Sequence, residues 1–87
     1  MGQALHLKHL GMSTLLKVGD AVHYTLFGGE QGISTVTDIE ICRKDEKYGR
    51  AVKSCHINKH HGVVNLNNGH WCYFDQINKI IKQNERN

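Results

Sequence analysis

The sequence predicts a mainly β fold, a small and strongly bent barrel of four to five strands with a short C-terminal helical turn. Three observations lead to this prediction. Apolar and polar residues alternate at period two in several short segments, such as residues 21–27. Clusters of glycine and asparagine separate these segments, and the chain contains no proline. Helical spacing of apolar residues is found near the C-terminus, from residue 77 onward.

The expected strands are short and are bounded by turn residues. In the first strand Val22, Tyr24 and Leu26 share one apolar face. In the second strand the alternation is imperfect at Val36, which predicts a bulge or a change of face there. The Asn-Asn-Gly stretch at 67–69 predicts a tight hairpin, because these residues tolerate positive φ. Strands are expected over residues 21–27, 33–42, 48–57, 63–66 and 70–74, with a turn at 17–20 and a flexible glycine loop at 28–32.

The C-terminal segment changes period. Ile77, Ile80 and Ile81 follow the i, i+3, i+4 spacing of a helix, and Asp75 precedes them as a candidate N-cap. A short helix or 3₁₀ turn is therefore expected there. The expected organisation is a flexible or loosely packed N-terminal tail at residues 1–14, the barrel at 15–82 and a polar C-terminal tail at 83–87.

The predicted core is built around Trp71, the largest apolar side chain of the sequence. The substitution Trp71→Ala is expected to unfold the domain, because truncating a large core aromatic costs about 3–5 kcal/mol. The cluster of His70, Trp71 and Cys72 is accordingly interpreted as one wall of the core rather than as a functional site. The predicted core residues are Val22, Leu26, Ile39, Val64, Leu66, Trp71 and Ile77.

Composition indicates one small globular domain. The 87 residues are 39% hydrophobic and 22% charged, and no apolar run approaches the ~18 residues that span a bilayer. Residues 1–12 do not have the pattern of a secretory signal. Three cysteines, none of them in a CxxC pair, favour free thiols in a reducing compartment. A cytoplasmic protein without a membrane partner is therefore expected.

Two stretches of the sequence resemble the SH3-like small β-barrels, including their KOW-type modules. The first is "LKVGDAVHY" with the glycines and "TDIE" that follow it, which is similar to the opening of these barrels. The second is "GVVNLNNGHWCYFDQINKI", which is similar to their closing hairpin and 3₁₀ element. This layout also resembles that of small uncharacterised bacterial and phage proteins. The resemblance covers residues 15–82 and implies an SH3-like barrel that acts as a binding module.

Two kinds of binding partner are open at this point. The aromatic grooves and edge strands of such barrels suit a protein or peptide partner, which is the leading interpretation. Residues 43–61 carry six basic against two acidic side chains in a chain of net charge +3, which favours an anionic partner such as a nucleic acid. A solvated loop face is the alternative explanation of these charges. The candidate residues for either partner are Arg43, Lys44, Lys47, Tyr48, Arg50, Lys53, Lys59 and Tyr73.

A small zinc-binding domain is the second alternative. Cysteine and histidine are the ligands that zinc prefers, but their spacing here is not that of paired ligands. The candidate ligands are Cys55, His60, His70 and Cys72. No catalytic residue and no cofactor are expected, because the sequence contains no phosphate loop, HExxH motif or nucleophile elbow.

Overall fold

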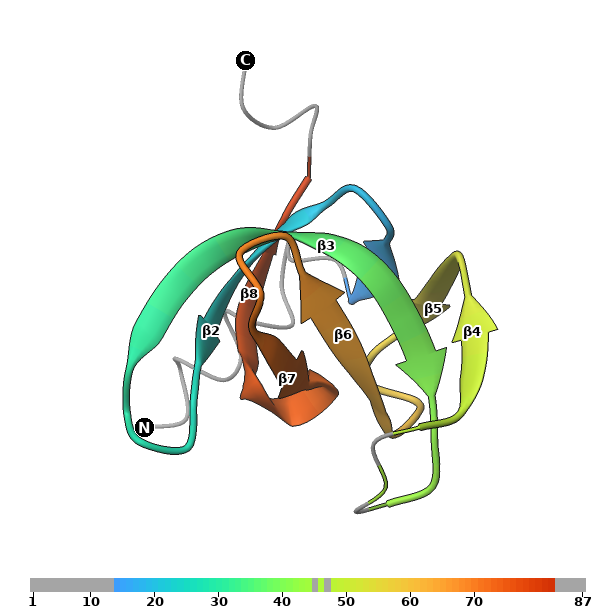
Figure 1. Cartoon of the computed structure of the whole chain (residues 1–87). Coiled ribbons are helices and arrows are strands. Elements are labelled where there is room, and N and C mark those ends of the chain that lie inside the picture. Colours follow the sequence, from blue (N-terminus) through green and yellow to red (C-terminus); the bar gives the residue numbers. More distant parts are fainter. Residues whose placement is uncertain (1–13, 45, 47, 83–87) are drawn as a thin grey trace, which may run out of the picture.

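The computed structural model describes residues 14–44, 46 and 48–82 (Figure 1), and the mainly β class predicted from the sequence is confirmed. The expected tails at 1–14 and 83–87 lie outside these residues except for Thr14. No helix of the described residues is long and apolar enough to cross a membrane. The elements are β1 (Leu15–Lys17), β2 (Ala21–Thr25), β3 (Gln31–Ile41), β4 (Arg50–Val52), β5 (Ser54–His56), β6 (Gly62–Leu66), β7 (Trp71–Tyr73), the 3₁₀ turn η1 (Phe74–Gln76) and β8 (Ile77–Ile81).

One antiparallel sheet organises the domain. Its strands follow the order β7-β6-β3-β2-β8, β4 pairs with the free side of β3, and β1 and β5 form a separate two-stranded sheet. No strand pairing among the described residues joins β7 to β8, so the sheet does not close into a barrel. The side chain of Gln76 bridges part of the gap, because its Oε1 accepts the Tyr73 N–H at 2.8 Å and its Nε2 donates to the Thr25 carbonyl at 3.2 Å.

Strand β3 is long and changes neighbours halfway along its length. Figure 1 shows it arching over the width of the domain. Residues 31–35 pair with β2, and residues 36–41 pair with β6. The pairing with β6 shifts register between Val36 and Asp38, which confirms the predicted bulge. The turn before β2 holds this point, because Gly19 N–H donates to the Val36 carbonyl at 2.9 Å and Val36 N–H donates to the Asp20 carbonyl at 2.8 Å.

Two hairpins of the sheet use the same turn. In the turn between β6 and β7, Leu66 N–H bonds to the His70 carbonyl and Gly69 N–H bonds back to the Leu66 carbonyl. In the turn between β2 and β3, Leu26, Gly29 and Glu30 repeat this pattern. Both glycines have φ near +90°, which L side chains rarely adopt. The Asn-Asn-Gly hairpin is thus confirmed, whereas the glycine loop at 28–32 is shorter than predicted because β3 already begins at Gln31.

The core lies between the inner faces of the strands, and it differs from the predicted core at one important position. Trp71 is exposed, so its assignment to the core is wrong, and Phe74 and Cys72 are buried instead. The ring of Phe74 rests on Gly62, where a Cβ would lie 2.4 Å from the Phe74 Cζ. Val22, Ile39, Val64 and Leu66 are buried as predicted, Leu26 and Ile77 are partly buried, and Leu16, Tyr24, Val36, Cys55 and Ile80 complete the core.

The prediction of a helical turn that contains Ile77, Ile80 and Ile81 is wrong. Ile77, Ile80 and Ile81 belong to strand β8, and the 3₁₀ turn lies just before it. The pairing of β8 with β2 shifts register so that Asn78 is an extra residue, which places Ile77 opposite Tyr24 and Ile80 opposite Val22. A bulged strand therefore turns apolar residues three apart toward the same side, as a helix does.

The predicted strand at 48–57 is also wrong, because it is two strands separated at Lys53. Residues 50–52 pair with β3, whereas residues 54–56 pair with β1. The chain changes from one sheet to the other at this break, which brings Cys55 into the core opposite Leu16. The described residues therefore contain eight strands rather than four to five.

Substitutions at Phe74 and Trp71 should separate the two aromatic environments. Phe74→Ala is expected to lower the free energy of unfolding by about 3–5 kcal/mol, because it empties a buried site. Trp71→Ala is expected to lower the free energy of unfolding by only about 1–2 kcal/mol, because the ring is only partly buried and its main loss is the contact with Tyr73. Urea denaturation followed by circular dichroism measures both values. Equal losses, or a larger loss for Trp71, would contradict this arrangement of the core.

Candidate binding surface

The outer side of β3, β6 and β7 carries two rows of side chains that face away from the core. Cys72 and Val64 are fully buried, so their neighbours along each strand point outward. Although Val63 lies on this outer side, it is only 3% exposed, which means that neighbouring side chains cover it. From β7 to β3, one row is Tyr73, Val63 and Glu40, and the other is Trp71, Asn65 and Asp38.

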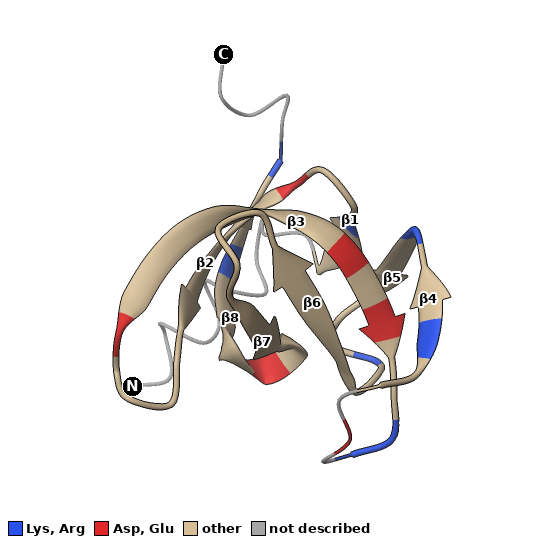
Figure 2. Ribbon diagram, in the orientation of Figure 1, with Lys and Arg blue, Asp and Glu red and all other residues tan. Residues whose placement is uncertain are grey.

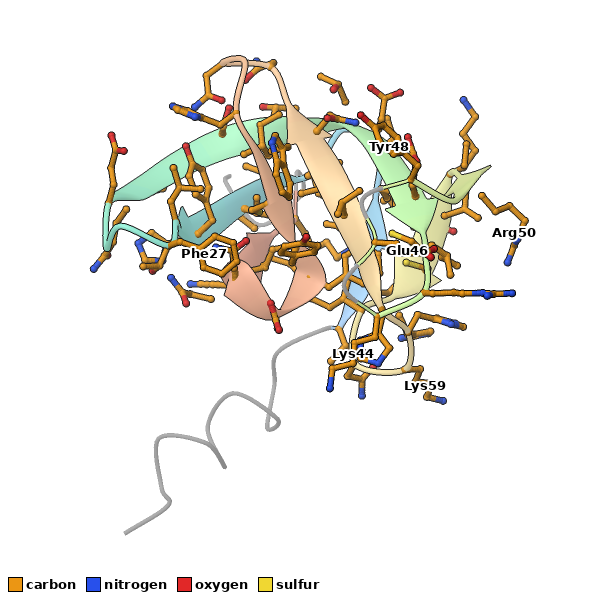
Figure 3. The ribbon with its side chains drawn as sticks, turned by 60° about the horizontal axis from the view of Figure 1, so that its bottom comes forward. Phe27, Lys44, Glu46, Tyr48, Arg50 and Lys59 are labelled. Atoms are coloured by element: carbon orange, nitrogen blue, oxygen red, sulfur yellow. The ribbon has the colours of Figure 1, made fainter. Side chains whose placement is uncertain are left out.

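Four aromatic side chains, Phe27, Tyr48, Trp71 and Tyr73, form what we call the aromatic surface. Tyr73 contacts Trp71 edge to face, with ring centroids 5.2 Å apart, and contacts Phe27 at 6.0 Å. Phe27 is 82% exposed, Tyr48 78% and Trp71 36%. Figure 3 shows Phe27 and Tyr48 far apart along this surface, with Phe27 at the left of the view and Tyr48 at the right. Large apolar rings so open to water lose the stabilisation that burial would give.

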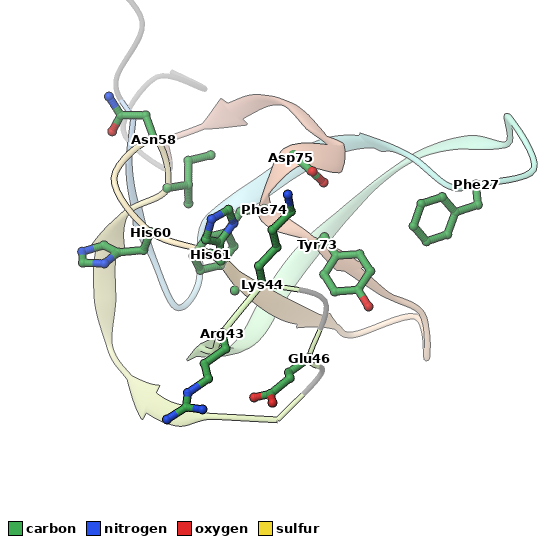
Figure 4. A pocket seen from close by; sticks show the side chains of 12 residues that line it. Phe27, Arg43, Lys44, Glu46, Asn58, His60, His61, Tyr73, Phe74 and Asp75 are labelled. Atoms are coloured by element: carbon green, nitrogen blue, oxygen red, sulfur yellow. The ribbon is translucent and has the colours of Figure 1, made fainter.

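A cavity of about 420 Å³ adjoins the aromatic surface at Phe27 and Tyr73. Its charged residues are balanced, with Arg43 and Lys44 against Glu46 and Asp75 (Figure 4). The remaining lining comes from Ile57, Asn58, His60, His61, Gly62 and Phe74. The loop between β3 and β4 and the loop between β5 and β6 thus meet η1 around one hollow.

The basic residues predicted from the sequence are spread over several places. Of the candidate residues that the structure describes, only Arg43 and Lys44 join Tyr73 at the large cavity. Arg50 lies on β4, and Lys53 lines a different hollow with Val18 and Thr37. Figure 2 shows basic positions on the loop after β3 and on β4, and acidic positions on the second half of β3. In Figure 3, Arg50 points outward in another direction than Lys44 and Lys59, while Lys47 is outside the described residues.

The structure does not bring the candidate zinc ligands together. Cys55 and Cys72 are buried in the core, whereas His60 and His70 are exposed. His70 precedes β7, at the end of the hairpin, and is exposed, whereas Cys72 lies within β7 and is buried. Among the described residues there is no group of three or more His, Cys, Asp or Glu side chains that could hold a metal ion.

Two members of the aromatic surface, Phe27 and Trp71, are not among the predicted site residues. Phe27 was assigned to a strand, but it occupies the first position of a hairpin turn, as Asn67 does in the other hairpin. Trp71 was assigned to the core because of its size. The alternation in Trp71-Cys72-Tyr73 does contain the correct signal, since it places Trp71 and Tyr73 on one face and Cys72 on the other.

The three cysteines are free thiols with suppressed reactivity. Burial, together with the negative charge of Asp75, raises the pKa of Cys72 to about 12. Burial also raises the pKa of Cys55. The pKa of Cys42 is raised by burial and by Glu40 and Glu46. A thiol with a raised pKa holds little thiolate at neutral pH, so none of these groups is prepared as a nucleophile.

Comparisons with protein-family models, curated proteins and solved structures gave no match for this chain. The geometry of the described residues therefore has to carry the functional argument.

Alkylation should distinguish the cysteines. In the native protein at pH 8, iodoacetamide is expected to modify partly exposed Cys42 slowly, and Cys55 and Cys72 only after unfolding. Because the pKa of Cys42 is raised above its usual 9.0, its rate should still be increasing as the pH passes that value. Mass spectrometry of proteolytic peptides measures each site. Native-state modification of Cys72 as fast as that of Cys42 would contradict the placement of Cys72.

Proposed function

We propose that this protein is a non-catalytic binding module with an SH3-like barrel, and that its aromatic surface binds an extended peptide segment of a partner protein. The strand order supports the barrel assignment, since β2, β3, β6 and β7 form an antiparallel meander and β8 returns beside β2 after a 3₁₀ turn. The Gln76 bridge between Tyr73 and Thr25 supports it further, because it links the free side of β7 to β2.

The observation that carries the binding proposal is the row of three rings at the surface. Tyr73 makes edge-to-face contacts with both Phe27 and Trp71, and Phe27 and Tyr73 border a cavity of about 420 Å³. Exposed aromatic patches of this kind mark binding sites, since aromatic side chains contribute much contact area at a small entropic cost. Phe27, which is 82% exposed, offers the most open ring of this row to an external ligand.

The charges around this row favour a peptide over a polyphosphate. Arg43 and Lys44 at the cavity are matched by Glu46 and Asp75, and Asp38 and Glu40 lie on the adjoining outer side of β3. A nucleic-acid site requires an excess of positive charge that follows the phosphates. A peptide with apolar side chains and charges of both signs complements the mixture that is present.

The peptide is expected to lie across the outer side of the sheet rather than to extend it. Strand addition at β7 needs its free backbone groups, but Gln76 already occupies the N–H of Tyr73. Side-chain contacts with the aromatic surface would then supply most of the affinity.

Panning of a displayed library of random dodecapeptides tests the proposal. We expect enrichment of peptides that combine apolar and charged residues, and loss of their binding in Phe27→Ser. The fold should tolerate this change because Phe27 is 82% exposed. Ile33→Ser is the matched control, because Ile33 is 63% exposed and contributes to neither the aromatic surface nor the cavity.

Two outcomes would overturn the proposal. One is the absence of enrichment above a protein-free control, or enrichment that Phe27→Ser and Ile33→Ser affect equally. The other is binding of a single-stranded oligonucleotide that is tighter than binding of any enriched peptide. If that binding weakened steeply with salt and disappeared when Arg43 and Lys44 are replaced, it would favour a nucleic-acid module.

A further inference from the structure

A second, smaller hollow lies at the other end of the aromatic surface. Its volume is about 90 Å³, and it lies between Tyr48, from the loop after β3, and Trp71, on β7. Glu40, Val63 and Asn65 complete its lining. Because Val63 is nearly inaccessible, its apolar side chain forms the floor, with two aromatic rings and a carboxylate around it.

The carboxylate of Glu40 is held in place. Its Oε1 accepts the N–H of Gly49 at 2.9 Å, which connects it to the loop that carries Tyr48. Gly49 itself packs against the end of β3, where a Cβ would lie 2.0 Å from the Ile41 carbonyl oxygen. These contacts fix the loop to the end of β3, so the position of Tyr48 is coupled to that of the Glu40 carboxylate.

The lining of this hollow is negative and aromatic. Glu40 forms no ion pair with any described residue, and no basic side chain from the described part of the chain lines the hollow. Asp38 lies one row away on the same side of β3. Aromatic faces attract cations through their quadrupole, and a nearby carboxylate strengthens that attraction.

We propose that this hollow binds the ammonium group of a lysine side chain, supplied by the peptide that the proposed function places on the aromatic surface. The aliphatic stem would lie along Trp71 and Tyr48, and the ammonium group would donate to Glu40 and Asn65. A compact ammonium suits a hollow of about 90 Å³ better than a broad guanidinium, and the Gly49 N–H already takes one of the lone pairs that a bidentate fork would compete for.

The lysine site and the large cavity belong to one continuous surface. Trp71 lines the small hollow, Tyr73 lines the large cavity, and the two rings are in contact. A peptide anchored by lysine at Trp71 would pass over Tyr73 toward the mixed charges around Arg43 and Lys44. This assignment rests on the proposed function for its ligand, although the cation site can be tested alone.

A titration with small probes tests the site. Nα-acetyl-lysine N-methylamide is added to ¹⁵N-labelled protein, and its norleucine analogue, which lacks the charge, is added to a second sample. The lysine probe is expected to shift the indole N–H of Trp71 and the amide of Gly49 in a saturable manner, whereas the norleucine analogue is expected to leave them unmoved.

Glu40→Gln should weaken binding of the lysine probe by roughly tenfold, because it removes the charge near the aromatic faces. The new amide oxygen still accepts the Gly49 N–H, so the loop is kept in place. Glu30→Gln is the matched control, since it removes the same charge from the exposed β2–β3 hairpin. Binding by Glu40→Gln equal to that by Glu30→Gln would overturn the proposal.

Other results separate this inference from the proposed function. Equal shifts with the norleucine analogue, or tighter binding of the arginine analogue, would overturn the lysine site while leaving peptide binding intact. Saturable binding of the lysine probe without any enriched dodecapeptide would retain the cation site and reject the peptide-binding function.

Discussion

The bend of β3 at Val36 is the constraint on which the rest of the structure depends. Both backbone groups of Val36 bond to the turn at Gly19 and Asp20 rather than to a neighbouring strand. The strand can therefore pair with β2 before this point and with β6 after it. The turn is itself fixed by the buried carboxylate of Asp20, which accepts the Lys17 N–H and lies 2.8 Å from the Nζ of Lys82. The beginning and the end of the described chain thus meet at the same residue.

The bend also decides which side of the sheet is available for binding. The inner faces of the strands enclose a core in which the ring of Phe74 packs against Gly62. No described strand pairs over the outer side of β3, β6 and β7, and a row of aromatic rings extends across it. Val63 lies on this outer side and is only 3% exposed, so neighbouring side chains cover the strand backbone there. An exposed aromatic row on a rigid sheet is positioned in advance for a ligand.

The sequence allowed much of the fold to be predicted and less of the surface. Local signals were sufficient for the Asn-Asn-Gly hairpin and for the bulge at Val36, because each depends on residues close in the sequence. β8 was mistaken for a helix, because the extra residue Asn78 produces helical spacing within a strand. Trp71 was predicted to be buried because of its size, although the alternation along β7 places it on the side opposite to buried Cys72. The meeting of Tyr48 with Trp71 across a hollow depends on tertiary contacts, so no local pattern could predict it.

The central claim is that the aromatic row lies at the surface, and the fluorescence of Trp71 tests it most directly. Trp71 is the only tryptophan of the chain, so the emission reports on this position alone. Because Trp71 is 36% exposed, we expect the native protein to emit at a wavelength between those of buried and of fully hydrated indole, and acrylamide to quench it to a substantial fraction of the value for the unfolded chain. Short-wavelength emission that acrylamide quenches only after unfolding would place Trp71 in the core and contradict the account.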